Sequence, residues 1–403
     1  MTRLPSSLPV AISDYSILTA LGKGVEANWR SVVNGDSGLR PNDFPGCDLE
    51  TRIGRVSDEH FEVLPADLQG LESRNNRLAL SGLSADGFVH RARAAAKRFG
   101  AHRTGVIIGT STSSIGRTEE GYTKLLPGDA FPAPWVQPDV QNPHSPGYLV
   151  ALLTGATGPC MTIGTACSSS AKVFASAARW LHAGVVDTVI VGGVDSLCLS
   201  VLYGFNSLQL VSNHPCRPFD SSRDGISIGE GAGFALVSRP GDSEAKCFLA
   251  GYGESSDAHH MSSPHPEGLG AEYAIREALQ RARLNPDDIG YINLHGTGTR
   301  VNDAVESVVI DRCFQGKTVA SSTKGWTGHT LGAAGIVESI VSIESLLRGV
   351  APGTLNTNQR FEGCSEKVLI SNCAYDAPAA MSNSFGFGGS NCSLVFSRDR
   401  TWS

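Results

Sequence analysis

Short β-rich runs alternate with amphipathic helical patterns along most of the chain. Apolar side chains recur at helical spacing in residues 77–99, 168–183, 271–282, 303–314 and 332–347. Runs rich in β-branched and other apolar residues predict strands at residues 104–108, 188–191, 234–237, 247–252, 289–294, 318–320 and 392–396. Because helices follow strands repeatedly, the pattern predicts a layered α/β fold.

A turn-forming Arg-Pro-Gly-Asp sequence at residues 239–242 divides the chain into two parts that show a similar alternation. We therefore predict an N-terminal half over residues 1–240 and a C-terminal half over residues 241–403. The two halves share no obvious residue-level repeat, so the letters alone do not establish a duplication. Residues 127–146 are rich in Pro, Asp, Asn and Gly and predict a long ordered loop.

Composition excludes several classes of protein. The 403 residues can bury a large core, and a formal net charge of −6 offers no basic excess for nucleic acid. The ten cysteines are scattered and include no Cys-x-x-Cys pair, so we expect neither a disulfide framework nor a zinc site. The start at Met1–Pro5 lacks the apolar core of a signal peptide, and no run of about eighteen apolar residues predicts a membrane span. A soluble protein of the reducing cytoplasm is expected.

Cys167 is the first candidate for chemistry, because it follows a β-branched run and precedes an amphipathic helix. N–H groups at a helix N-terminus favour a thiolate, so we expect a lowered thiol pKa and a sulfur able to attack an acyl carbon. The alternative is a cysteine that packs as a small buried hydrophobe. The thiol alone does not decide between them.

Two histidines occupy matched settings. His295, in residues 291–299, and His329, in residues 321–329, each follow a short β-like run and lie among Gly and Thr. Neutral imidazoles in such loops can donate hydrogen bonds to a developing enolate or oxyanion. The Gly-rich residues 383–391 permit close backbone approach and offer further N–H groups, although an ordinary hairpin has the same composition.

Taken together, these segments resemble a β-ketoacyl-acyl carrier protein synthase of the elongating Cys-His-His type, within the thiolase-like superfamily. The similarity covers roughly residues 8–398. The stretches that carry it are residues 164–169, 217–220 with 223–225, 229–233, 295–299 with Asp303, 324–335 and 383–391. The resemblance implies a thiolase-like α/β fold, in which two related halves stack as five α-β-α-β-α layers. It assigns the nucleophilic cysteine to the N-terminal half, and both histidines and a gating loop to the C-terminal half.

The resemblance also implies a reaction, the decarboxylative Claisen condensation. Cys167 would take an acyl group from the phosphopantetheine thioester of acyl carrier protein, and a malonyl thioester would lose carbon dioxide beside His295 and His329. The backbone N–H groups of Cys167 and Phe387 match the family's oxyanion hole. Neither a permanently bound cofactor nor a metal is implied, since the substrates arrive on the carrier protein.

Further residues match supporting positions of the family. Lys324 matches its active-site lysine and Glu338 the partner of that lysine, a pair that would orient His329. In another setting, an exposed lysine and an exposed helical glutamate contribute little. Thr297 and Thr299 match positions that hydrogen-bond the pantetheine arm, although two turn threonines would look the same.

The acyl pocket is the least specific part of the resemblance. Phe385 and Phe387 match the gating loop, where simple core packing is the alternative. Residues 109–114 match the mouth of the pocket, and Ser111 and Thr112 stand where many relatives carry glycine. This hydroxyl-rich version is similar to the aryl-polyene ketosynthases and predicts an altered pocket.

Partners follow from the same resemblance. Acyl carrier proteins are strongly acidic, so a local basic patch is expected, with Arg217, Arg74 and Arg77 as candidates unless they are ordinary solvated arginines. Residues 127–146 would help to form the acyl pocket and the interface of a homodimer, or of a heterodimer with a ketosynthase-like chain-length partner.

Two other functions stay open. A catalytically silent chain-length partner would lack the nucleophile, and the presence of Cys167, His295 and His329 argues against it. A thiolase acting on coenzyme A esters would use a second cysteine, for which Cys392 is the candidate. The paired histidines and residues 383–391 fit a decarboxylating synthase better than a thiolase.

Overall fold

Two five-stranded units with the same strand order make up most of the large sheet in the computed structural model, which describes residues 9–400. The N-terminal unit has the order β6 (Cys160–Ile163), β5 (Thr104–Gly109), β7 (Thr188–Asp195), β9 (Gly231–Ser238), β1 (Val10–Thr19). The C-terminal unit has the order β12 (Val319–Ser321), β11 (Ile289–Asn293), β15 (Ala379–Gly386), β16 (Ser390–Ser397), β10 (Cys247–Ser256). In both units the first three strands are parallel and the last two run antiparallel to their neighbours. The strand order therefore shows a duplication that the amino-acid sequence does not show.

The two units join edge to edge. β1 and β10 pair antiparallel over three residues each, and β2 (Gly22–Lys23) adds an eleventh strand beside β1. The predicted division after residue 240 falls between β9 and β10, and as a domain boundary it stays a prediction.

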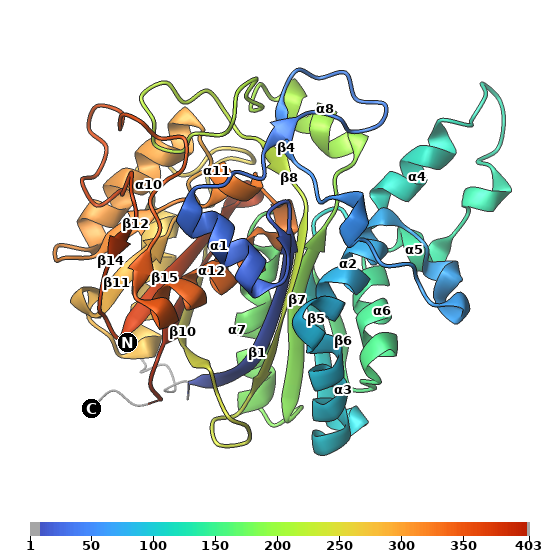
Figure 1. Ribbon diagram of the computed structural model, residues 1–403, viewed down its shortest axis with the longest axis horizontal. Coiled ribbons are helices and arrows are strands. Elements are labelled where there is room, and N and C mark those ends of the chain that lie inside the picture. The colour runs from blue at the N-terminus through green and yellow to red at the C-terminus, as the bar shows by residue number, and fades with distance from the viewer. Residues whose placement is uncertain (1–8, 401–403) are drawn as a thin grey trace.

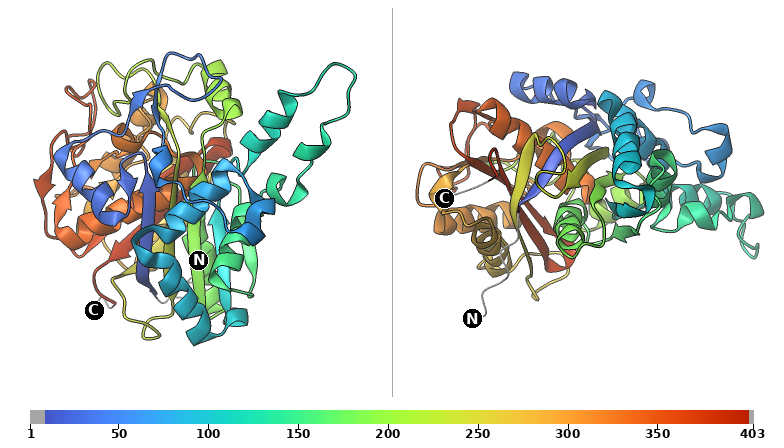
Figure 2. Two further views of the ribbon diagram at one scale, coloured as in Figure 1. Left: turned by 45° about the vertical axis from the view of Figure 1, so that its right-hand side comes forward. Right: turned by 90° about the horizontal axis from the view of Figure 1, so that it is seen from below.

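Helices complete the five layers (Figures 1 and 2). The central layer consists of α7 (Ser169–His182) and α12 (Ala334–Arg348), which pack on each other and on strands of both units. The outer layers are α2 (Arg74–Ser84), α3 (Phe88–Phe99) and α6 (Ser145–Thr154) on the N-terminal unit, and α9 (Leu269–Ala282) and α10 (Arg300–Cys313) on the C-terminal unit. The thiolase-like five-layer fold is thus confirmed.

The remaining elements are short or lie at the periphery. The helices are α1 (Val25–Asn34), α4 (Ile115–Tyr122), α5 (Pro138–Gln141), α8 (Leu199–Ser207) and α11 (Lys324–Thr327). The strands are β3 (Arg40–Pro41), β4 (Arg52–Gly54), β8 (Ile228–Gly229), β13 (Val350–Ala351) and β14 (Cys373–Ala374). The helix predicted over residues 77–99 is broken in two, because Asp86 and Gly87 adopt positive φ angles of 53° and 71°.

An arm stands out from the N-terminal unit in Figure 2, formed by α4, α5 and the chain between them. The segment predicted as a loop at residues 127–146 lies in this arm and contains α5 and the start of α6. Within residues 9–400, no helix is both long and apolar enough to cross a bilayer, and all ten cysteines are free. Met1–Pro5 lies outside the described residues.

The duplicated topology determines where the candidate residues meet. Cys167 lies between β6 and α7, and His329 lies between β12 and α12, which is the equivalent connection of the other unit. The loop after β11 carries His295, and the loop after β5 carries Ser111 and Thr112. Because α7 and α12 pack against each other, the two connections that precede them are brought side by side.

Candidate active site

Cys167 occupies a strained turn just before α7. The preceding residue, Ala166, has a φ of 50°, which is uncommon for a residue other than glycine. The turn is closed by hydrogen bonds from Ser169 Oγ to the Ala166 carbonyl at 2.6 Å and from the Ser168 N–H to the Thr165 carbonyl at 3.3 Å. Only 5% of the Cys167 surface is exposed, so the sulfur is reached through the cavity beside it.

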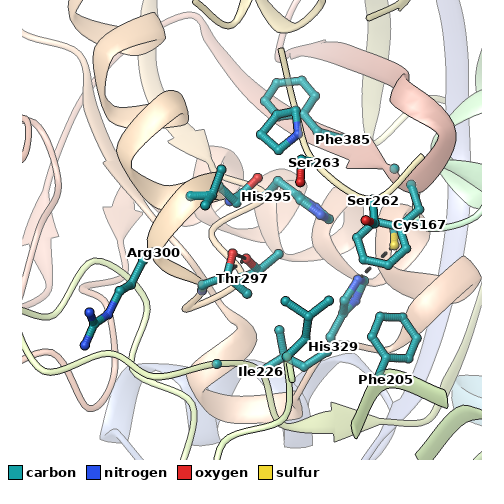
Figure 3. A pocket seen from close by; sticks show the side chains of 18 of the residues that line it. Cys167, Phe205, Ile226, Ser262, Ser263, His295, Thr297, Arg300, His329 and Phe385 are labelled. Atoms are coloured by element: carbon teal, nitrogen blue, oxygen red, sulfur yellow. Dashed lines mark hydrogen bonds between the residues drawn. The ribbon is translucent and has the colours of Figure 1, made fainter. Parts of the chain in front are cut away.

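His329 faces this sulfur from the C-terminal unit (Figure 3). Its Nε2 lies 3.0 Å from Cys167 Sγ, and its Nδ1 accepts a hydrogen bond from the Leu331 N–H at 3.3 Å. A nitrogen that accepts from an N–H carries no proton, so the proton of the neutral ring is on Nε2. His329 therefore presents an N–H donor to the sulfur.

His295 is held in the same tautomer by a different group. The Lys324 ammonium lies 3.4 Å from His295 Nδ1 and donates to the His295 carbonyl at 2.5 Å. Lys324 also forms a buried ion pair with Glu338. The predicted pairing of Lys324 with Glu338 is present, but the lysine contacts His295 and not His329, because its position at the start of α11 directs it to the loop after β11.

Both imidazoles are neutral. Burial lowers the pKa of His295 and of His329 well below 6.5, and the nearby Lys324 charge lowers both further. The two rings meet edge to face, with centroids 5.4 Å apart. Two uncharged N–H donors thus converge on one point beside the sulfur.

The thiol departs from what its position at a helix start predicts. Burial raises the pKa of the Cys167 thiol to about 11, although the Lys324 charge and a hydrogen bond from the Phe387 backbone act to lower it. Loss of water around the sulfur outweighs the favourable N–H groups of the turn. The resting sulfur is therefore a thiol at neutral pH.

Cys167, His295 and His329 are also residue types that bind zinc, and their ligand atoms lie within 4.8 Å of one another. A metal-bound Nε2 must be unprotonated, which would place the proton of each ring on Nδ1. Both Nδ1 atoms face donors, namely the Lys324 ammonium and the Leu331 N–H. The set fits two N–H donors and a thiol better than a metal centre.

The chain at residues 383–391 closes one side of the site. It is β15, a short turn and β16, which is a hairpin, and the Phe387 backbone hydrogen-bonds the Cys167 sulfur. The predicted approach of this backbone to a ligand stays a prediction. Phe387 stacks on Phe205 with ring centroids 5.5 Å apart, and Phe385 lies against His295 at 6.2 Å. Phe205, Phe385 and Phe387 all line the cavity that contains Cys167, and the first and second of these rings are labelled in Figure 3.

A cavity of about 430 Å³ leads from Cys167 past His295 to the surface. Thr297 and Thr299 line it and hydrogen-bond each other at 2.8 Å, and Phe385 and Phe387 line it too. Ser111 and Thr112 are not among its lining residues, since their hydroxyl groups turn to the buried carboxylate of Asp195. Their role in the acyl pocket stays a prediction.

Sequence reasoning missed some residues that shape the site. Glu306 accepts the backbone N–H groups of His295 and Gly296 at 2.7 Å each, and burial raises its pKa to about 7. Arg300 begins α10 at the outer end of the cavity. Only their closeness in sequence to His295 could have indicated Arg300 and Glu306, because both follow it within a short stretch.

Other candidates lie away from the cavity. Each proposed docking arginine has an acidic partner: Arg74 with Glu230, Arg77 with Glu72 and Arg217 with Asp224. Their role in docking therefore stays a prediction. Cys392, the candidate second cysteine of a thiolase, is fully buried in β16 and does not line the cavity.

Known proteins match this chain along nearly its whole length. The family of the β-ketoacyl synthase N-terminal domain matches residues 7–243, and that of the β-ketoacyl synthase C-terminal domain matches residues 246–358. The chain is 34% identical to the mitochondrial 3-oxoacyl-[acyl-carrier-protein] synthase of Arabidopsis thaliana, over 96% of this chain and 92% of that protein. It is 30% identical to 3-oxoacyl-[acyl-carrier-protein] synthase 2 of Vibrio cholerae, over 96% and 99%.

A solved structure agrees with these relatives. A chain of the solved complex of the ketosynthase ApeO with its chain length factor ApeC, from Xenorhabdus doucetiae, is 36% identical to this chain. It superposes with a TM-score of 0.88 over 98% of this chain and 100% of that one. With both units matched and the cysteine and two histidines assembled at one point, the chain belongs to the β-ketoacyl synthase family.

Proposed function

We propose that this chain is an acyltransferase that condenses an acyl group held on Cys167 with malonyl-acyl carrier protein. The product is a β-ketoacyl-acyl carrier protein, made during elongation of a fatty-acid, polyketide or polyene chain. The observation that supports this most is the meeting of the Cys167 sulfur with two imidazoles that are both held as Nε2–H donors.

The first step is transfer of the acyl group. The Cys167 sulfur attacks the carbonyl carbon of the acyl thioester, and the pantetheine sulfur leaves with the proton of the Cys167 thiol. The backbone N–H groups of Cys167 and Phe387 stabilise the negative oxygen of the tetrahedral intermediate. Lys324 and the Phe387 backbone lower the pKa of the thiol against the effect of burial, so they aid this step.

The second step forms the carbon–carbon bond. The malonyl thioester loses carbon dioxide, and the electron pair of the broken bond forms an enolate whose oxygen accepts from His295 and His329. The enolate carbon attacks the acyl carbonyl on Cys167, and the Cys167 sulfur leaves and takes up a proton from water, which restores the thiol. Neutral donors suit this step because they stabilise charge on the thioester oxygen, and a neutral N–H is too weak an acid to protonate the carbanion.

Supporting residues hold the parts in place. Lys324, paired with Glu338, orients His295 and keeps both rings neutral. Thr297 and Thr299 bind the amide groups of the pantetheine arm. Phe387, with Phe385, controls entry to the sulfur.

Acyl carrier protein is the proposed partner in every turnover. A second copy of the chain, or a ketosynthase-like chain-length partner, is proposed to pack against the arm. The arm exposes the apolar side chains of Tyr122, Leu126 and Val136. The outer edge of β6, the end strand of the N-terminal unit, pairs with no further strand within residues 9–400. The free cysteines support a reducing compartment, and we propose the cytoplasm.

The alternatives fit less well. A silent chain-length partner has no use for a sulfur, two aligned donors and an open cavity in one place. A thiolase needs a second cysteine near the first, and Cys392 does not line the cavity.

Trapping of the acyl-enzyme tests the proposal. Incubation with acyl-acyl carrier protein is expected to add one acyl group to Cys167, found by mass spectrometry of the digested protein. Cys167→Ala should remove the adduct, whereas Cys392→Ala, which changes another buried cysteine, should keep it. An adduct on another cysteine, or none on the wild-type protein, would overturn the proposal.

A further inference from the structure

Asp195 gathers hydrogen bonds from two loops beneath the active site. It ends β7 and is fully buried. Its Oδ1 accepts from the hydroxyl groups of Thr110 at 2.6 Å and Thr112 at 2.9 Å, and its Oδ2 accepts from Ser111 Oγ at 2.6 Å. The backbone N–H groups of Ser111 and Thr112 also donate to this carboxylate, at 2.8 and 3.0 Å. Hydroxyl and N–H groups thus stabilise its charge in place of a lysine or arginine.

The second loop that Asp195 holds belongs to the other unit. The Gly332 N–H donates to Asp195 Oδ2 at 2.6 Å. A Cβ on Gly332 would lie 2.5 Å from this oxygen and 2.6 Å from the Ser111 nitrogen, so no side chain fits between the loops. Asp195 therefore joins the segment at residues 110–112 to the turn that follows His329.

This turn determines which nitrogen of His329 carries the proton. Leu331 has a φ of 56°, a conformation that persists in a non-glycine residue only where its surroundings enforce it. In that conformation the Leu331 N–H points to His329 Nδ1, while the next N–H, that of Gly332, points to Asp195. Two successive N–H groups are thus directed at two acceptors, one of which is the imidazole.

We propose that Asp195 is a positioning residue for His329. By holding the Gly332 N–H, it keeps the strained turn in the one arrangement that delivers the Leu331 N–H to Nδ1. The imidazole proton then stays on Nε2, facing Cys167. The consequence for turnover rests on the proposed function, in which this Nε2–H stabilises the enolate, whereas the tautomer itself does not depend on it.

Asp195→Asn tests the proposal, because asparagine has nearly the same size but loses the charge and one acceptor oxygen. We expect malonyl decarboxylation to fall about tenfold, the scale of a weakened hydrogen bond to a charged group. Acyl transfer to Cys167 should change less than about threefold, because the backbone N–H groups that serve it are untouched. Asp220→Asn is the matched control. Asp220 is also buried and accepts the N–H groups of Ser222 at 2.8 Å and Asn358 at 2.8 Å, but it does not contact the His329 turn.

Nitrogen NMR of histidine-labelled protein measures the tautomer without turnover. Comparison with His329→Gln identifies the His329 signals. In the wild type, Nε2 should be protonated and Nδ1 unprotonated, and Asp195→Asn should yield a mixture of both tautomers, while Asp220→Asn leaves the signals in place. Gly332→Ala, which pushes the same turn off the carboxylate from the other side, should shift the same signals.

The outcomes separate the two hypotheses. A single Nε2–H tautomer in both Asp195→Asn and Gly332→Ala would overturn the role of Asp195, whatever the activity. A mixed tautomer accompanied by wild-type decarboxylation would support Asp195 as the positioning residue and would contradict the proposed part of His329 in the reaction.

Discussion

The loops that follow β5 and β11 occupy equivalent places in the two units, yet their side chains do opposite things. After β5, the hydroxyl groups of Thr110, Ser111 and Thr112 turn inward to a buried carboxylate. After β11, His295 and the threonines that follow turn to an open cavity. One copy of the loop holds the structure together, and the other lines the cavity beside Cys167.

The next connections show the same division. The one before α7 carries Cys167, the proposed nucleophile, and the one before α12 carries His329, the proposed donor. A duplicated fold thus supplies equivalent positions, whereas the side chains placed there decide between attack, donation and support. If this division is correct, the two units make separable contributions to catalysis.

The largest effect should come from removing the contribution of one unit at a time. Cys167→Ala should abolish acyl-enzyme formation and condensation, because the N-terminal unit then has no nucleophile, and decarboxylation of malonyl-acyl carrier protein should continue. His295→Ala and His329→Ala should lose decarboxylation by ~10²-fold or more, the scale for an oxyanion donor, and should still form the acyl-enzyme. Carbon dioxide release and mass spectrometry of Cys167 measure the two halves of the reaction separately.

Circular dichroism serves as the control for folding of these three variants. Near wild-type decarboxylation in either histidine variant would contradict separate contributions of the two units. Loss of acyl-enzyme formation at Cys167 in both histidine variants would contradict them too.

A smaller effect is expected from the lysine that links the two contributions. Lys324→Met removes the charge that lowers the pKa of His295, His329 and Cys167 alike. All three pKa values should rise, so the histidines take up protons more readily and the thiol ionises less. We expect decarboxylation to fall at least about tenfold. Alkylation of Cys167 by iodoacetamide at pH 8 should also slow.

The exposed Lys317 supplies a control, because Lys317→Met makes the same change away from the site. Unchanged alkylation in Lys324→Met would show that the ammonium has no effect on the thiol.

Much of this comparison could be predicted from sequence, and the remainder has physical reasons. The strand runs, the turn between β9 and β10 and the settings of Cys167, His295 and His329 are local patterns, so the sequence alone indicates them. The duplication is a matter of strand order, which the letters do not carry.

Contacts between distant residues were the harder part. Asp195 lies 85 residues beyond Thr110, so nothing local indicates that the hydroxyl groups turn away from the pocket. The thiol pKa also escaped prediction, because burial depends on everything packed around the sulfur and outweighs the local helix start.

Because His295 and His329 of the C-terminal unit are buried and neutral, the free energy of unfolding should fall as the pH is lowered. The pKa of His295 and of His329 is lowered in the folded protein, so below pH 6.5 only the unfolded chain takes up these protons. Their contribution is present above pH 6.5 and is lost as pH falls, by about 1.4 kcal/mol per pH unit for each ring. The difference in unfolding free energy between wild type and His295→Asn, measured in urea from pH 7 to pH 5, should show this slope.

Glu338 changes the stability in the opposite direction with pH. Its pKa is raised to about 7, so its contribution to the free energy of unfolding is lost as pH rises through that value. The variant comparison removes this background, because Glu338 is present in both proteins. A difference that stays constant between pH 7 and pH 5 would mean that His295 is not held neutral by burial.

The smallest effect on activity is expected from Arg300, which lies where the loop after β11 ends. The loop after β5 ends at the buried Ser113 and Ser114, whereas the loop after β11 leads outward to Arg300, an exposed cation at the mouth of the cavity. Within residues 9–400 its guanidinium forms no ion pair with any carboxylate, in contrast to the docking candidate Arg74. The outer end of the carrier arm is a phosphodiester, so we expect Arg300 to meet that anion while Thr297 holds the arm further in.

Arg300→Ala should therefore raise KM for acyl-acyl carrier protein about threefold to tenfold with little change in kcat, since an exposed charge pair contributes modestly. Three acyl donors make the test more specific: acyl-acyl carrier protein, acyl-phosphopantetheine, and acyl-pantetheine, which lacks the phosphate. Phosphate recognition predicts a raised KM for the first two donors and an unchanged KM for the third. If KM rises for acyl-acyl carrier protein alone, Arg300 instead contacts the acidic surface of the carrier protein. Arg30 lies on the exposed side of α1 and supplies the control, since Arg30→Ala should leave KM unchanged for all three donors. An unchanged KM for all three donors would show that the outward end of this loop has no binding role, so that the contrast between the two loops would rest on His295 alone.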